Sequence, residues 1–253
     1  MKPQKTAIIT GAGQGIGLAI AEKLAAQSIN IILNDLEEGL ITEACERISH
    51  IHGVRAIAIP GDASSEEVID AMVETALSNF GTVDIVVANS GITLFGAFLE
   101  YSRADFLEVT RVNQAGTFFL AQAASRVMKD QPNGGALLFT SSVTAHQSHE
   151  NLAAYAMSKA ALEMLAKNLV LELAPYKIRV NTIAPGATVT NRTVMDPDYE
   201  ATWSKITPLG RPAAVQDIAN AAAFLVSEEA KHITGQTLII DGGWTSVSPS
   251  PYA

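Results

Sequence analysis

The chain has 253 residues and a formal net charge of -9, with an isoelectric point near 5.0. Nucleic acids and anionic membranes bind basic surfaces, so this acidic balance argues against either as the main partner. The single cysteine, Cys45, cannot form an internal disulfide, which suits a reducing compartment. Glycines interrupt the apolar stretch near the N-terminus, so we expect neither a signal peptide nor a membrane span, and a cytoplasmic protein.

Short apolar runs alternate with segments of helical spacing, and no linker divides them, so we expect one domain over residues 1–253. The predicted strands are Thr6–Thr10, Ile29–Asp35, Val54–Pro60, Val83–Ala88, Ala136–Ser141, Ile178–Ile183 and Thr237–Ile240. The predicted helices are Ile16–Gln27, Glu38–Ser49, Glu66–Asn79, Ala104–Lys129 (with a break or kink near residues 113–116), Ala153–Leu173 and Ala214–Ser227. This alternation predicts an α/β fold, a doubly wound parallel sheet of about seven strands with helices on both faces, known as the Rossmann fold.

A glycine-rich turn follows the first predicted strand and opens the first helix, with the pattern T-G-x-x-x-G-x-G over residues 10–17. Glycines let the backbone turn tightly and approach a pyrophosphate, whose charge the helix N-terminus stabilises. The pattern therefore predicts a dinucleotide site, although a plain tight connection would also use glycines. The residues that we assign to this site are Gly11, Gln14, Gly15, Ile16 and Gly17.

The second predicted strand ends at Asp35, which Leu36 and two glutamates follow. A carboxylate at this place accepts hydrogen bonds from the ribose hydroxyls of the adenosine half and repels a 2′-phosphate. Asp35 and Leu36 therefore favour NAD over NADP as the cofactor. The alternative is that Asp35 only caps the following helix.

Two further strand ends fit the same ligand. Asp62, followed by Ala63, comes after the third strand and can accept from the adenine amino group, or it can cap the next helix. The turn Asn89-Ser90-Gly91 follows the fourth strand and lets the backbone approach the ribose and the nicotinamide ring. We assign both segments to cofactor binding.

A tyrosine and a lysine four positions apart, Tyr155 and Lys159, face the same way on a predicted helix. A phenol titrates at about 10, and a nearby ammonium is expected to lower its pKa, which makes a usable general acid–base. A single pair of this kind is otherwise most often an exposed surface pair. Ser142, just past the fifth strand, can hold the substrate oxygen as charge develops there, and Ser141 is its rival.

Other chemistries have little support in the sequence. His146 and His149 lie near Glu150, but no Cys/His cluster has metal-ligand spacing, so we expect no metal. The chain has no G-x-S-x-G elbow, which argues against a hydrolase triad.

These motifs together resemble the classical short-chain dehydrogenase/reductase family, and most of all its glucose and polyol dehydrogenases. The likeness covers essentially the whole chain. The segments that carry it are Thr10–Gly17, Asp62, Asn89-Ser90-Gly91, Val112-Asn113, Ser142, Tyr155, Lys159, Pro185-Gly186, Ile233-Thr234-Gly235-Gln236 and Asp241-Gly242-Gly243. Only Ser90 departs from the usual pattern, where the family has Ala.

The resemblance implies an NAD-dependent enzyme with a defined set of site residues. Tyr155 exchanges the proton of the reacting oxygen, and Lys159 lowers its pKa and holds the nicotinamide ribose. Ser142 positions the substrate, and Asn113 anchors a water of the proton relay. The residues expected to contact the nicotinamide carboxamide are Pro185, Gly186, Thr188 and Thr190. The resemblance also implies a homotetramer, with the last helices and strand at the interfaces and the C-terminal tail near a neighbouring subunit's site.

Residues 187–208 form the expected substrate lid, which is largely polar. Polar walls and the family likeness lead to the hypothesis that the substrate is a sugar or polyol. The expected substrate contacts are Thr93, His146, His149, Arg192 and Trp203. Two alternatives stay open: a 3-oxoacyl-thioester reductase, and a catalytically silent protein that senses NAD(H) or serves as a scaffold.

Overall fold

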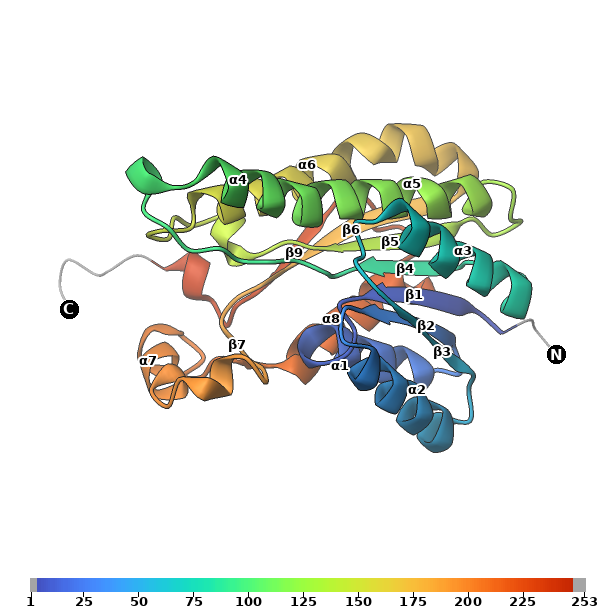
Figure 1. The fold of residues 1–253 in the computed structure, drawn as a ribbon, viewed down its shortest axis with the longest axis horizontal. Coiled ribbons are helices and arrows are strands. Elements are labelled where there is room, and N and C mark those ends of the chain that lie inside the picture. Colours follow the sequence, from blue (N-terminus) through green and yellow to red (C-terminus); the bar gives the residue numbers. More distant parts are fainter. Residues whose placement is uncertain (1–3, 248–253) are drawn as a thin grey trace.

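A computed structural model describes residues 4–247 and places seven parallel strands in one sheet of order β3-β2-β1-β4-β5-β6-β9 (Figure 1). These strands are β1 (Thr6–Thr10), β2 (Asn30–Asp35), β3 (Ala56–Pro60), β4 (Ile85–Ala88), β5 (Gly135–Thr140), β6 (Ile178–Pro185) and β9 (Thr237–Ile240). The order reverses between β1 and β4, so the loops after these two strands diverge and leave room for a ligand. The doubly wound parallel sheet expected from the sequence is confirmed.

Helices cover both faces of the sheet (Figure 1). The α-helices are α1 (Gly15–Ala25), α2 (Glu38–His52), α3 (Glu66–Phe80), α4 (Arg103–Thr110), α5 (Thr117–Met128), α6 (Ala153–Leu173), α7 (Tyr199–Ile206) and α8 (Val215–Val226). The core on one face is built from α1, α2 and α8, and that on the other from α3, α5 and α6. Among residues 4–247, no helix is both long enough and apolar enough to cross a membrane.

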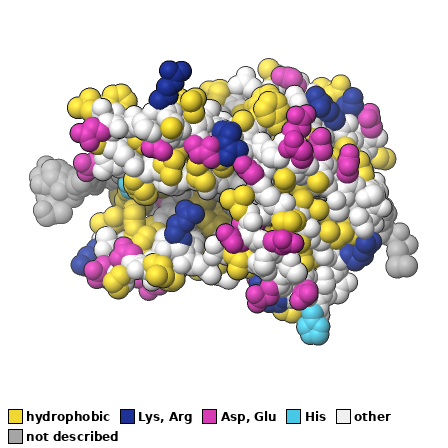
Figure 2. Space-filling view, in the orientation of Figure 1, with side chains coloured by type: hydrophobic (Ala, Val, Ile, Leu, Met, Phe, Trp, Pro, Cys, Tyr) yellow, Lys and Arg dark blue, Asp and Glu magenta, His cyan; other side chains and the backbone are white. Residues whose placement is uncertain are grey.

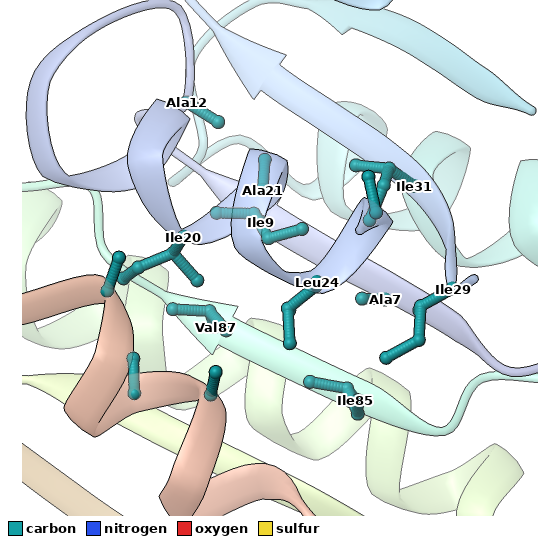
Figure 3. Close-up of a cluster of buried hydrophobic side chains, with 14 of the residues drawn as sticks. Ala7, Ile9, Ala12, Ile20, Ala21, Leu24, Ile29, Ile31, Ile85 and Val87 are labelled. Carbon is teal, nitrogen blue, oxygen red and sulfur yellow. The ribbon is translucent and has the colours of Figure 1, made fainter. Parts of the chain in front are cut away.

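Both faces of the central strands are buried, which explains their near-continuous apolar sequences. On the α1 side, Ile20 and Leu24 lie beside Ile9 of β1 and Val87 of β4 (Figure 3). These four side chains are fully buried. The packing fixes the N-terminal end of α1 at the carboxyl end of β1, where the glycine-rich turn lies.

The helix predicted over Ala104–Lys129 is interrupted by a π-helical segment, Arg111–Gly116, which joins α4 to α5. The expected break near residues 113–116 is therefore present as a change of helical pitch. The Thr117 hydroxyl donates to the main-chain oxygen of Asn113 at 3.0 Å. Single π turns inside α-helices concentrate at functional sites, and this one places Asn113 in the interior.

The segment predicted as a lid contains secondary structure that the sequence pattern did not reveal. Strand β7 (Thr188–Val189) pairs with β8 (Ala213–Ala214), and α7 lies between them in the chain. Two-residue strands are too short to show a periodic pattern, and α7 has only eight residues.

Candidate active site

The glycine-rich turn has a backbone that only glycine adopts easily. Gly11 and Gly15 have φ values of 61° and 60°, in the left-handed region. A Cβ on Gly17 would lie 2.2 Å from the main-chain oxygen of Gly11, so this position has no room for a larger residue. Helix α1 begins at Gly15, and Gln14 makes no side-chain cap hydrogen bond within the described chain. The first N–H groups of α1 therefore remain available to an anion, as a dinucleotide pyrophosphate requires.

Asn89, at the end of β4, holds this turn in place. Its side-chain amide donates to the main-chain oxygens of Thr10 and Gly11, both at 3.1 Å. Its carbonyl oxygen accepts from Thr140 at 3.2 Å. The main-chain N–H groups of Asn89 and Ser90 both donate to the Thr10 hydroxyl. The Asn89 side chain thus ties the ends of β1, β4 and β5 together, in addition to its predicted place beside the cofactor.

Asp35 closes the other side of the turn. Its Oδ2 accepts from the Gly13 N–H at 2.9 Å, whereas Leu36 beside it is exposed. The same carboxylate therefore orders the glycine-rich turn and presents negative charge at the end of β2, where the adenosine ribose is expected. The alternative reading as a cap of α2 has weaker support, because its bond to the Glu37 N–H is 3.4 Å long.

Asp62 lies in a charged cluster that the sequence analysis did not find. One carboxylate oxygen accepts from the Ser64 hydroxyl at 2.7 Å, and the other from Arg111 at 2.6 Å. Arg111 also pairs with Glu108. Burial raises the pKa of Asp62, but the bonds from Ser64 and Arg111 outweigh it and hold the pKa below its usual range. Any adenine contact would add to these bonds.

The predicted reactive residues meet at the carboxyl end of β5. Lys159 is 3% exposed, and its ammonium donates to the Thr140 carbonyl at 2.7 Å. The Lys159 Nζ lies 5.6 Å from the centre of the Tyr155 ring. Burial lowers the pKa of Lys159 to about 8. A Cβ on Gly91 would lie 3.1 Å from the same Nζ, so the turn after β4 borders this group.

In the protein alone the pKa of Tyr155 is raised, and the lowering of this pKa by Lys159 stays a prediction. Burial raises the pKa of Tyr155, while the hydroxyls of Ser142 and Thr93 and the charge of Arg192 act in the opposite direction. The physical reason is that the phenol is desolvated, and the ammonium of Lys159 is directed to the Thr140 carbonyl. The same observations place three predicted site residues around the phenol, namely Ser142, Thr93 and Arg192.

The two adjacent serines point in different directions. The Ser141 hydroxyl donates to Glu163 at 2.7 Å and approaches the Lys159 carbonyl at 3.1 Å. Ser142 instead lies beside Tyr155 and accepts from the Thr144 N–H. This arrangement favours Ser142 over its rival. The sequence analysis missed Glu163, which follows Lys159 by four positions on the same helical face and also contacts His146 at 2.9 Å.

Asn113 is fully buried, and its side chain is occupied by protein partners. It exchanges two hydrogen bonds with the main chain of Ile92, at 2.8 and 3.0 Å, and donates to the Ser158 hydroxyl at 3.0 Å. A water of the predicted relay would therefore have to use the main-chain oxygen of Asn113, which already accepts from Thr117.

The chain after β6 crosses toward the glycine-rich turn. The Gly186 N–H donates to the Ile240 carbonyl at 2.9 Å, which joins this segment to β9. The Thr188 hydroxyl donates to the Gly186 carbonyl, and the Thr190 N–H donates to Thr193. A Cβ on Gly15 would lie 3.8 Å from the Thr190 side chain. The predicted carboxamide contacts thus reach the predicted pyrophosphate site across the carboxyl edge of the sheet.

The lid carries aromatic side chains as well as the expected polar side chains. Trp203 of α7 packs edge-on against Trp244 with 5.3 Å between centroids, and His149 lies 5.1 Å from Trp244. Tyr199 adjoins Trp203 at 6.1 Å. Trp244 belongs to the C-terminal tail, residues 242–253, which was expected near a neighbouring subunit's site. It packs against Trp203 and His149 of its own chain. Residues 248–253 of this tail lie outside the described residues. The expectation of a largely polar lid is therefore incomplete, because α7 also contributes aromatic rings.

Comparison with known proteins agrees with this arrangement. Residues 11–245 match the family model described as enoyl-(acyl carrier protein) reductase. Glucose 1-dehydrogenase 2 of Bacillus subtilis is 37% identical over 247 residues, which is 95% of each chain. A solved 7α-hydroxysteroid dehydrogenase, complexed with NADH and 7-oxo glycochenodeoxycholic acid, has a TM-score of 0.89, 36% identity and 94% and 93% coverage of the two chains.

A gluconate 5-dehydrogenase from Burkholderia cenocepacia, solved with NADP and tartrate, is also similar, with a TM-score of 0.88, 32% identity and 96% coverage of each chain. The three relatives each cover at least 94% of this chain, and the two solved structures contain nicotinamide cofactors. The chain belongs to the classical short-chain dehydrogenase/reductase family and is an oxidoreductase for secondary alcohols or the corresponding carbonyl compounds.

Proposed function

We propose that the protein is an NAD-dependent dehydrogenase that interconverts a secondary alcohol and a carbonyl group on a sugar or polyol. The observation that carries this proposal is the convergence of Tyr155, Ser142 and Lys159 at the carboxyl end of β5, beside a glycine-rich turn with free helix N–H groups. A catalytically silent sensor would not need this set of three, so the enzyme is favoured over the sensor or scaffold.

The residues divide the reaction between them. When bound, nicotinamide supplies the acceptor for the hydride that leaves the alcohol carbon. The Tyr155 oxygen takes the proton of the substrate hydroxyl, so that hydride and proton leave together as the carbonyl forms. The Ser142 hydroxyl donates to the substrate oxygen and opposes its charge. Lys159 is a buried cation 5.6 Å from the centre of the Tyr155 ring, and a cation at this place favours the phenolate form of Tyr155.

Asp35 supports NAD rather than NADP. Its carboxylate lies at the end of β2 and is fixed by the Gly13 N–H, and the exposed Leu36 offers no cation to a 2′-phosphate. The substitution Asp35→Asn keeps an acceptor for Gly13 and removes the charge. We expect it to raise the ratio of kcat/KM for NADP over NAD by about 10-fold, which is about 1.4 kcal/mol. A wild-type enzyme that prefers NADP would contradict the assignment.

A sugar or polyol is proposed because of the sequence similarity to glucose 1-dehydrogenase 2 and because of polar groups near Tyr155, namely Thr93, Ser142 and Arg192. A 3-oxoacyl thioester is the second candidate, since the matching family model is described as an acyl-carrier-protein reductase. A hydroxysteroid is included in the test because of the similarity to the 7α-hydroxysteroid dehydrogenase.

The test follows NADH formation optically at mildly alkaline pH over glucose, other aldoses, polyols, 3-hydroxyacyl thioesters and a hydroxysteroid. NAD and NADP are compared in parallel. Turnover of sugars or polyols with NAD supports the proposal. Turnover of thioesters alone moves the assignment to the second candidate, and bound NADH without any turnover would favour the sensor.

A homotetramer is also proposed, since two separate apolar surfaces remain exposed on the described chain. One lies on α4, α5 and α6 and includes Phe118, Phe119 and Met164, and the other includes Leu238 and Ile239 of the edge strand β9. Two self-complementary contacts of this kind generate a closed tetramer. A cytoplasmic location is also proposed, because the single cysteine, Cys45, is a free thiol and a chain without an internal disulfide suits a reducing compartment.

A further inference from the structure

Four aromatic rings meet at the substrate side of the molecule, and they come from three separate segments. His149 belongs to the loop between β5 and α6, Tyr199 and Trp203 to α7, and Trp244 to the 3₁₀ turn Trp244–Ser246 after β9. The ring centroids of neighbouring members lie 5.1 to 6.3 Å apart, with Trp203 and Trp244 edge-on at 85°. We call these four residues the aromatic cluster.

The cluster lies at the carboxyl edge of the sheet. Its segments follow β5, β6 and β9, which are neighbours in the sheet, so all three emerge at one carboxyl edge. Ser142 begins the loop that carries His149, and Tyr155 follows that loop in α6. The Tyr199 hydroxyl accepts from the Thr188 N–H at 3.1 Å, which attaches α7 to the end of β6.

The cluster lies outside the two buried cores. His149, Trp203 and Trp244 are each partly exposed. Burial lowers the pKa of His149, so the imidazole ring is uncharged at neutral pH. Figure 2 shows a hollow between the side of the molecule that carries α4 and the side that carries α7, with many hydrophobic side chains around it. Because three of its side chains are partly exposed, the cluster has surface that a ligand can reach.

We propose that the aromatic cluster is a stacking platform that selects cyclic secondary alcohols over open-chain ones. A six-membered ring offers a broad face of C–H bonds to an indole, and aromatic faces carry negative charge that attracts C–H edges. A ring also loses little conformational freedom on binding, whereas an open chain of equal size must be ordered bond by bond. The inference rests on the proposed oxidation of secondary alcohols and adds that the preferred substrate is cyclic.

The first experiment measures kinetics on matched pairs: glucose against glucitol, and cyclohexanol against 2-hexanol. We expect Trp203→Ala and Trp244→Ala to raise KM for the cyclic member about 10-fold more than KM for its open-chain partner. Trp203→Phe and Trp244→Phe keep an aromatic face and should restore most of the cyclic preference. Tyr176→Ala, an exposed aromatic residue beyond the opposite end of α6, is the control and should leave both members unchanged.

A second readout does not need turnover. The chain has two tryptophans, and both belong to the cluster, so tryptophan fluorescence reports on it alone. In Tyr155→Phe, which binds without reacting, the cyclic member of each pair should change the emission at lower concentration than its open-chain partner. Trp203→Phe then isolates the signal of Trp244.

The outcomes distinguish a failure of the proposed function from a failure of the proposed stacking platform. If the wild type oxidises neither these four alcohols nor any other sugar or polyol of the panel with NAD, the proposed function fails, and the fluorescence titration alone tests the platform. If the alanine variants weaken cyclic and open-chain members equally, or the fluorescence does not distinguish them, the cluster is only a structural contact and the inference is overturned.

Discussion

At the residue scale, the buried ammonium of Lys159 lowers the stability of the folded protein, although the proposed reaction needs it. Its ordinary pKa of 10.5 falls to about 8 because burial disfavours the charged form. Below pH 8 the folded and unfolded chains are both protonated, and the folded state carries the whole burial penalty. The difference between the two pKa values corresponds to about 3 kcal/mol. Between pH 8 and 10.5 the folded state releases its proton first, so stability from this group rises with pH.

We therefore expect Lys159→Met to stabilise the protein at pH 7. The burial penalty of about 3 kcal/mol disappears, and the Thr140 carbonyl loses a hydrogen bond worth about 1 kcal/mol, which leaves a gain of about 2 kcal/mol. Urea unfolding of the variant and the wild type measures the difference. The gain should shrink as the pH rises above 8 and become a loss of about 1 kcal/mol above pH 10.5, and activity should be lost at every pH. A variant less stable than the wild type at pH 7 would contradict the proposed penalty.

At the element scale, most of the site was predictable because parallel strands align their carboxyl ends. Asp35, Ser142 and the segment after β6 each follow a strand recognised from its apolar run, so the sheet topology brings them together. The contacts of Arg111 and Glu163 were not predictable. Arg111 meets Asp62 through the π-helical segment, and Glu163 meets Ser141 across two elements. Neither contact leaves a periodic signal in the sequence.

The strand-to-helix turn gives a prediction at the same scale. Gly17→Ala places a Cβ 2.2 Å from the Gly11 oxygen and 2.7 Å from the Asn89 amide, so β1 and α1 must separate. We expect a loss of about 2 kcal/mol or more in unfolding free energy and at least about 10-fold weaker NADH binding. The matched control is Gly39→Ala in α2, where the new Cβ meets nothing within 4 Å. It should be neutral or stabilising by up to about 1 kcal/mol. Equal behaviour of the two variants would show that the turn tolerates a side chain.

At the scale of the whole molecule, two layers of helices bury the two faces of the sheet. The apolar composition of the strands already indicated that both faces are covered. The sequence pattern recovered this order of elements because most of the strands are continuous apolar runs and the helices between them have helical spacing. It did not recover the aromatic cluster, since His149, Trp203 and Trp244 come from loops and short helices whose meeting depends on how the chain returns after β6 and β9.

The exposed apolar surface on α4, α5 and α6 gives a prediction for the assembly. Sedimentation should show a particle of about four times the 26.7 kDa chain mass. Phe119→Glu buries a charge in that surface and should yield smaller particles. Ile51→Glu, on the exposed side of α2, is the control and should keep the wild-type size. A monomer at all concentrations, or dissociation by both variants, would contradict the interface.

The central claim is that Tyr155 exchanges the substrate proton in an NAD-dependent dehydrogenase. Its most direct test compares the wild type with Tyr155→Phe in NADH formation on the best sugar or polyol, alongside NADH binding measured by fluorescence. We predict that kcat falls by about 100- to 10,000-fold while NADH binds with unchanged affinity. A Tyr155→Phe variant that still turns over at the wild-type rate would contradict the account.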